Sequence, residues 1–320
     1  MRSLSNNCLG AAGAAALAPA LAANGGLTSI NLYGNKLCGG VWTDDWSDYK
    51  AEQDGNYTAK GIIAIADALR VNGGLTALDL SLNNLDDEGV SAVCEAIQSK
   101  KETKLASLNF GNNDIGPVGA NALAAMVAVT GSLTALDLSS NELKDEGVSA
   151  VCEAIQSNKE TKLTSLNFEF NGIGPVGANA LAAMVAVTGS LTALDLSCNT
   201  LKDEGVREVC EAIQNNKETK LTSLNFGCNG IGPVGANAVA AMVVVTGSLT
   251  VTNLLSNQLD AESAKMLAEV AKQKGISLCG IQRDQTTADF FNQNLKPPDA
   301  ILLASDLSQA VVTGALTKME

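Results

Sequence analysis

The chain of 320 residues contains no histidine, and only 3% of its residues are aromatic. Without histidine, neither a Ser-His-Asp nor a Cys-His arrangement for nucleophilic catalysis is available. Zinc sites are commonly built from histidine and paired cysteines, and the sequence also has no C-x-x-C pair. We therefore expect no catalytic residues, no metal site and no cofactor.

Basic residues are also scarce. Lys and Arg number 21 against 34 Asp and Glu, which gives a net charge of −13 at pH 7. Because no basic stripe is present to neutralise phosphates, the composition argues against nucleic-acid binding. The acidic excess favours solubility and a basic protein partner. No uninterrupted apolar run reaches the roughly 18 residues of a membrane span, so we expect no membrane partner.

What the sequence has in abundance is repetition. Residues 116–139 recur letter for letter as residues 174–197, 58 positions later, and a third copy from Gly232 diverges at Val239 and Val244. Each 58-residue unit holds two halves that fit L-x-x-L-x-L-x-x-N-x-L. The halves open at Leu27, Leu75, Leu105, Leu133, Leu163, Leu191, Leu221 and Leu249. A fixed period of this kind indicates a repeat architecture.

These halves resemble the leucine-rich repeats, specifically the long, alternating type of ribonuclease inhibitor. The resemblance implies an α/β solenoid shaped as a horseshoe, with parallel strands on the concave face and helices on the convex face. In residues 136–138 the two leucines then point inward and Asp137 points outward. Residues 147–155 place their apolar side chains on one helical stripe. One unit cannot bury its apolar face alone, so stacked neighbours must form a continuous core.

Asparagine holds the same place in eight half-repeats. These residues are Asn35, Asn83, Asn113, Asn141, Asn171, Asn199, Asn229 and Asn257. A stacked amide both donates and accepts hydrogen bonds, so the pattern predicts a structural ladder.

The predicted solenoid covers residues 1–273, with an inserted loop at about 38–58. Residues 274–320 form degenerate terminal repeats that end in mid-repeat. Within them, residues 276–281 and 290–295 indicate weakened strands, and 314–319 follows the start of another half-repeat. Solenoids usually carry polar end caps, and neither end shows one. Three interpretations stay open: a fragment of a longer array, a gene product that was cut short, or a cap formed by the region from Lys274 onward.

The cysteines carry information about the compartment. Cys94, Cys152 and Cys210 recur every 58 residues on helices, which is typical of buried core thiols in a reducing, cytoplasmic environment. Cys198 and Cys228 lie near strand ends in adjacent half-repeats, and a disulfide between them is an alternative.

The N-terminal Ala/Leu run at residues 8–23 mimics a signal peptide. Its register matches the helix of a partial repeat, which we favour over secretion.

One motif resembles a cofactor site. Residues 172–177 match G-x-G-x-x-G between a strand and a helix, and Asp195 lies about where a ribose-binding acid would. However, Ile173 occupies a core position of the repeat, and Asp114 replaces the first glycine in the earlier copy. We therefore interpret the motif as a helix start.

The candidate binding surface has two parts. The concave face should carry an Asp/Asn row at its centre, and an insertion of about 20 residues between Leu37 and Gly61 holds both tryptophans. Insertions in solenoids often lie on the binding face, and aromatic residues anchor interfaces. The candidate contact residues are Tyr33, Trp42, Asp44, Asp45, Trp46, Tyr49, Asp79, Asp137, Glu169 and Asp195. The alternatives are a solvated, unused face and a loop folded back over the next repeat.

Together these features favour a non-enzymatic scaffold for protein–protein interaction. The chain also resembles the repeat regions of Ran GTPase-activating proteins and of nucleotide-binding innate receptors. These resemblances imply two alternatives. The first is a regulator of an enzyme in trans, either GTPase-activating or ribonuclease-inhibitor-like. The second is a ligand-sensing repeat fragment of a larger receptor. The identity of the partner and the oligomeric state stay open.

Overall fold

The computed structural model describes residues 4–39, 57–100, 103–291, 293–309 and 313–319. The chain forms two compact units, unit 1 (Met1–Leu163) and unit 2 (Thr164–Glu320), and each is described by itself.

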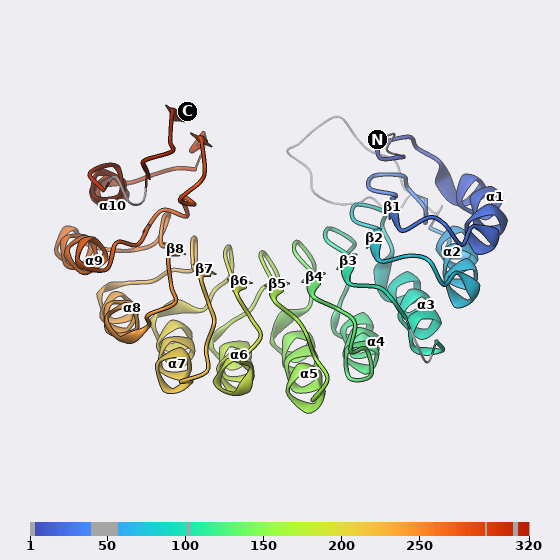
Figure 1. The fold of residues 1–320 in the computed structure, drawn as a ribbon, viewed down its shortest axis with the longest axis horizontal. Coiled ribbons are helices and arrows are strands. Elements are labelled where there is room, and N and C mark those ends of the chain that lie inside the picture. The colour runs from blue at the N-terminus through green and yellow to red at the C-terminus, as the bar shows by residue number, and fades with distance from the viewer. Residues whose placement is uncertain (1–3, 40–56, 101–102, 292, 310–312, 320) are drawn as a thin grey trace. The chain divides into compact units, whose positions relative to one another are not determined.

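Unit 1 alternates helices with short strands (Figure 1). Its elements are α1 (Gly10–Ala23), β1 (Ser29–Asn31), α2 (Lys60–Val71), β2 (Ala77–Asp79), α3 (Asp86–Gln98), β3 (Ser107–Asn109), α4 (Pro117–Val127), β4 (Ala135–Asp137) and α5 (Lys144–Ser157). The strands pair in parallel and in chain order, with Ile30, Leu78, Leu108 and Leu136 in register. Consecutive helices pack on one another, on the opposite side from the free face of the strands.

Unit 2 continues the alternation. Its elements are β5 (Ser165–Asn167), α6 (Pro175–Val187), β6 (Ala193–Asp195), α7 (Lys202–Asn215), β7 (Ser223–Asn225), α8 (Pro233–Val245), β8 (Val251–Asn253), α9 (Ala261–Lys274), β9 (Thr287–Ala288), α10 (Pro297–Leu307) and β10 (Lys318–Met319). Strands β5 to β8 pair in parallel and in order. After β8 the ladder continues, in the part of the chain that the structure describes, as two isolated bridges, Val251 to Ser277 and Asn253 to Cys279.

The core follows the repeat. Strands β1 to β7 each bury their central residue and leave both neighbours at least partly exposed, as Ala135–Asp137 does with Leu136 at 1% exposure. The predicted helical stripe is confirmed: Val148, Val151 and Cys152 are fully buried and Ile155 is 1% exposed. Fully burying an aliphatic side chain stabilises a fold by about 1.5–3 kcal/mol, so the stacked repeats share one apolar layer. The predicted α/β solenoid of leucine-rich repeats is therefore confirmed.

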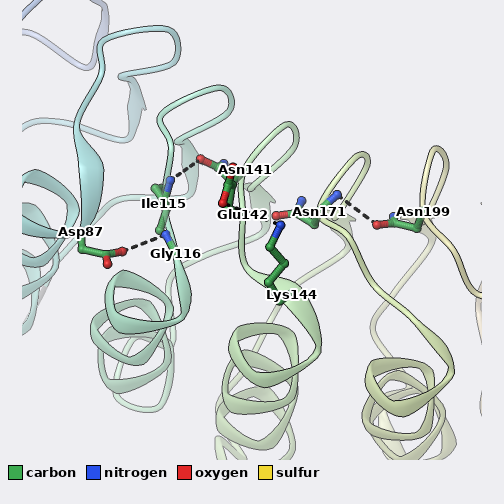
Figure 2. A network of polar contacts seen from close by, with 8 residues as sticks. All are labelled: Asp87, Ile115, Gly116, Asn141, Glu142, Lys144, Asn171 and Asn199. Carbon is green, nitrogen blue, oxygen red and sulfur yellow. Dashed lines mark hydrogen bonds and ion pairs between the residues drawn. The ribbon is translucent and has the colours of Figure 1, made fainter. Parts of the chain in front are cut away.

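The asparagine ladder is also confirmed. The buried Asn83 accepts hydrogen bonds at its Oδ1 from the N–H groups of Asn35 (3.0 Å) and Leu37 (3.3 Å) in the preceding half-repeat. Its Nδ2 donates to the carbonyls of Leu32 and Leu80, both at 2.9 Å. Figure 2 shows equivalent bonds, from Ile115 N to Asn141 in unit 1 and from Asn171 N to Asn199 in unit 2. Each amide thus satisfies the backbone of two half-repeats.

The terminal regions partly follow the expected register. Residues 10–23 form α1, which packs on α2 as the helix of a partial repeat. At the other end, the strand expected within residues 290–295 is wrong, because the strand lies earlier, at β9. The partner of β9 is β10, whose register joins Thr287 to Lys318, and the described residues of 290–295 have no such neighbour.

Candidate partner-binding face

The strands expose one face on the side away from the helices, and we call it the strand face. Its central row consists of Asn31, Asp79, Asn109 and Asp137 in unit 1, and of Asn167, Asp195, Asn225 and Asn253 in unit 2. All eight side chains are half-buried or exposed, as the alternation predicts.

The carboxylates of this row are held by neighbouring side chains. Asp79 accepts at Oδ1 from the N–H (3.0 Å) and Oγ (2.6 Å) of Ser81, and at Oδ2 from Asn31 Nδ2 (2.9 Å). Asp195 repeats this arrangement with Ser197 and with Asn225 Nδ2 at 2.9 Å. The row therefore presents fixed negative charges, a property that the outward-pointing pattern did not predict.

The inserted loop lies mostly outside the described residues, which include none of its candidates Trp42, Asp44, Asp45, Trp46 and Tyr49. Its two ends are described.

The N–H of Thr58 donates to the carbonyl of Cys38 at 2.9 Å, which closes the base of the insertion. The hydroxyl of Tyr57 donates to the carbonyl of Leu85 at 2.8 Å, and burial raises the pKa of Tyr57. The insertion is therefore tied to the next repeat. The candidate Tyr33 lies two residues after β1, and its side chain is exposed.

The candidate Glu169 lies at the rim of the strand face, just after β5. Its N–H donates to Asn167 Oδ1 at 2.8 Å, and the following residue, Phe170, is 63% exposed with a φ of +51°. A left-handed conformation is rare for a bulky side chain, so this position presents an aromatic ring to solvent at some cost in strain.

Cys198 and Cys228 come together in adjacent half-repeats of unit 2. Both are free thiols, and the N–H of Cys198 donates to the carbonyl of Gly227 at 2.9 Å. Burial, the neighbouring Cys228 and the charge of Glu169 raise the pKa of Cys198 to about 12. The predicted proximity is confirmed, and in this structure the two residues form a thiol pair rather than a disulfide.

The periodic cysteines behave as predicted. Cys94, Cys152 and Cys210 are fully buried, and burial raises the pKa of each thiol. A thiol that stays protonated is a poor nucleophile and metal ligand, so these three act as core side chains.

A cavity of about 280 Å³ opens on the strand face of unit 2, where the ladder ends. Asp195, Asn225 and Asn253 line it from the row, and Asp289 and Phe290 line it from the segment after β9. Of these, sequence reasoning identified only Asp195. The sequence did contain a signal for this location. The central row alternates Asn and Asp along the chain, and Asn253 breaks the alternation because it stands where an aspartate is expected.

The cofactor-like motif is structural, as interpreted. Ile173 is fully buried, so the motif cannot present its loop as an open cradle. In the copy that starts α8, the N–H groups of Gly232 (2.6 Å) and Gly235 (2.9 Å) donate to Asp203 Oδ1 of the preceding helix. Because donors of this kind hold the pyrophosphate in dinucleotide sites, a protein carboxylate already occupies that position.

In unit 1, Asp87 caps the start of α4 in the same way. Its Oδ1 accepts hydrogen bonds from the N–H groups of Gly116 and Gly119, both at 2.8 Å. Figure 2 shows the bond from Gly116. The hydrogen bonds that Asp87 and Asp203 accept thus come from the start of the next helix.

Within the described ranges, no group of three or more Cys, Asp and Glu side chains is arranged to hold a metal ion. Among the helices that the structure describes, none combines the length and apolar character needed to cross a membrane.

Comparison with known proteins agrees with the repeat geometry. The leucine-rich-repeat family model matches residues 75–94, 101–124, 132–152, 159–182, 190–210 and 217–240. The chain is therefore a leucine-rich-repeat protein. Its repeats are of the ribonuclease-inhibitor-like type, since the chain is 29% identical to mouse ribonuclease inhibitor over 199 residues, which cover 62% of this chain and 43% of that protein.

Two further relatives share the repeats. The human NACHT, LRR and PYD domains-containing protein 13 is 30% identical over 204 residues, 64% of this chain and 19% of that protein. RAN GTPase-activating protein 2 of Arabidopsis thaliana is 34% identical over 135 residues, 42% of this chain and 24% of that protein. The chain thus spans less than half the length of each of these three relatives.

Proposed function

We propose that this protein is a non-enzymatic scaffold that binds another protein through its strand face. The observation that carries the proposal is the row of fixed Asp and Asn side chains, such as Asp79 and Asp195, on a surface that the helices leave open. Leucine-rich repeats generally bind proteins, which supports this assignment. The periodic buried thiols support a cytoplasmic location, where they would stay reduced.

The partner that fits this face best is a protein with a basic segment. The row presents carboxylates, and the chain as a whole carries a charge of −13. Complementary charge steers association and fixes register more than it adds affinity. Affinity then requires aromatic anchors, which we assign to Tyr33, Trp42 and Trp46 at the insertion, with Asp44, Asp45 and Tyr49 around them.

Regulation of an enzyme in trans is a second candidate. The similarity to RAN GTPase-activating protein 2 favours it, although that similarity covers 42% of this chain. Stimulated GTP hydrolysis by a small GTPase would support this candidate, and an unchanged turnover rate would remove it.

The proposal predicts that a partner contacts the strand face and not the helices. A photo-crosslinking amino acid at Asp79 or Asp137 is expected to trap a partner in native lysate. The matched control places it at Val129, which is 67% exposed at the end of α4. Equal trapping at Val129 would contradict the proposal.

The contribution of the insertion is tested by Trp42→Ala combined with Trp46→Ala. We expect weaker trapping at Asp79 with an unchanged circular dichroism spectrum, because the described ends of the loop stay hydrogen-bonded. Unchanged trapping would remove the tryptophans from the binding surface but leave the strand face in place.

A further inference from the structure

We propose that the cavity at the end of the strand face in unit 2 binds an arginine side chain of the partner. This inference rests on the proposed function, because it names a side chain that the strand face would recognise.

The cavity forms because the sheet stops there. Among the described residues, strand β8 is followed in the ladder by isolated bridges to Ser277 and Cys279. Gly280 then adopts a φ of +78°, a conformation that glycine tolerates and other residues rarely adopt. The chain thereby leaves the sheet and returns with Asp289 and Phe290, which line the cavity together with the row residues of β6 to β8.

Its charge is negative. Asp195 contributes one carboxylate from β6, and Asp289 contributes another from the returning segment. The described residues that line the cavity include no lysine or arginine. A carboxylate can accept about four hydrogen bonds. The carboxylate of Asp289 accepts one from the N–H of Phe291 at 2.8 Å, so it has capacity to accept hydrogen bonds from a ligand. A bound cation would therefore meet carboxylates from two elements.

An amide and an aromatic ring complete the lining, and both suit a planar cation. The amide is that of Asn253, which stands where the alternation of the row predicts an aspartate. Its Oδ1 accepts a hydrogen bond from the N–H of Leu255 at 3.0 Å. Two glycines keep this amide accessible: a Cβ on Gly227 would lie 3.0 Å from Asn253 Nδ2, and a Cβ on Gly280 would lie 3.4 Å from Asn253 Cβ. Phe290 adds aromatic surface, on which guanidinium groups stack more readily than ammonium groups.

The size of the cavity supports a side chain as its occupant. Sites for small molecules and cofactors usually measure about 300–1,000 Å³. At about 280 Å³, this cavity lies just below that range and is open to the strand face along which a partner segment would run. A single long side chain of an extended segment fits both features.

The test uses the full chain and a C-terminally amidated pentapeptide with a central arginine flanked by serine and glycine, labelled at its N-terminus with a zwitterionic rhodamine dye so that the arginine supplies the net charge. The matched peptides carry citrulline, which has the same shape without the charge, or lysine. We expect the arginine peptide to bind at least about 10-fold more tightly than the citrulline peptide, measured by fluorescence polarisation at low salt. The lysine peptide is expected to bind between the two.

Variants locate the site. Asp289→Asn and Asp195→Asn are each expected to weaken binding of the arginine peptide by about 3- to 10-fold, since each removes one charge contact. The control is Glu269→Gln, which removes a charge from an exposed position on α9, outside the cavity and away from the strand face, and is expected to leave the affinity unchanged. Circular dichroism of each variant verifies that the fold is kept.

Three outcomes would overturn the inference. Equal binding of the citrulline peptide would exclude recognition of the cation, and unchanged binding by Asp289→Asn would place the arginine elsewhere. Competition by a neutral monosaccharide such as glucose, lost in Asp289→Asn, would reassign the cavity to carbohydrate. If trapping at Asp79 persists in any of these cases, the cavity assignment fails while the scaffold stands; if that trapping is absent, the scaffold itself fails.

Discussion

The buried carboxylate of Asp306, on α10, organises the chain just beyond β8 in unit 2. It is fully buried and accepts hydrogen bonds from Ser277 Oγ (2.7 Å) and from the N–H groups of Leu278 (2.9 Å) and Cys279 (3.0 Å). These backbone donors belong to the segment beyond β8, which joins that strand through isolated bridges. Such donors must find partners when buried, and one side chain supplies several of them. We therefore propose that the region from Lys274 onward serves as a cap.

Burial raises the pKa of Asp306 above its ordinary value of 3.8, although the hydrogen bonds oppose the shift. The folded state therefore holds its proton to higher pH than the unfolded state. Between 3.8 and the raised pKa the folded state binds more protons, so this group lowers the free energy of unfolding as pH rises. Below pH 3.8 the group is protonated in both states and does not change the free energy of unfolding. Above the raised pKa it is ionised in both states, and its reduction of the free energy of unfolding no longer changes with pH.

We predict that Asp306→Asn flattens this pH dependence. Because the amide Nδ2 cannot accept a hydrogen bond, the variant should also lose about 1–3 kcal/mol of unfolding free energy at pH 7. Urea unfolding of both proteins from pH 3.5 to 7 measures the effect: the stability advantage of the wild type should shrink as pH rises. An advantage that grows with pH would contradict the assigned direction.

At the scale of the elements, each capped helix depends on the repeat before it. Asp203 belongs to α7, but its Oδ1 accepts from the N–H groups of Gly232 and Gly235 at the start of α8. A carboxylate there satisfies orphan donors and complements the helix dipole. The capping bond thus also ties adjacent repeats together.

Asp203→Ala should therefore cost about 1–2 kcal/mol of unfolding free energy, the loss typical of a removed helix cap. Glu204→Ala changes the neighbouring, exposed acid and should have little effect. Thermal unfolding by calorimetry compares the two variants. Equal losses would show that the general negative charge at this helix start matters, rather than the bond to α8.

The sequence predicted the elements that repeat and one contact between repeats, the asparagine ladder, but it missed the capping bonds between successive helices. The strands, the helical stripe around Val151 and the ladder of Asn83 follow from periodicity, because each position sees the same environment in every copy. The bonds from Gly232 and Gly235 to Asp203 join residues 29 and 32 positions apart, and no local pattern specifies them.

The candidate site was less predictable than the fold. Asp79, Asp137 and Asp195 were identified because strand alternation fixes their direction. The cavity was not, since it depends on how the chain leaves the sheet after Gly280, where the repeat has degenerated. Phe290 and Asp289 reach the row only through that path.

For the whole molecule, the excess of acidic over basic residues sets how a partner approaches. A net charge of −13 attracts a basic ligand over a distance limited by salt, with a Debye length of about 30 Å at 0.01 M and about 8 Å at physiological ionic strength. Steering of this kind acts on the association rate, whereas the contacts in the complex determine dissociation.

We therefore predict that association of the arginine peptide slows by about 10-fold or more between 0.01 and 0.5 M ionic strength, while its dissociation rate changes much less. Stopped-flow fluorescence with the full chain measures both rates. The citrulline peptide is the control, because without charge its association should be nearly independent of salt. If salt instead changes mainly the dissociation rate, charge acts through the contacts of the bound peptide with Asp195 and Asp289. In that case the electrostatic field of the whole chain contributes little to recognition.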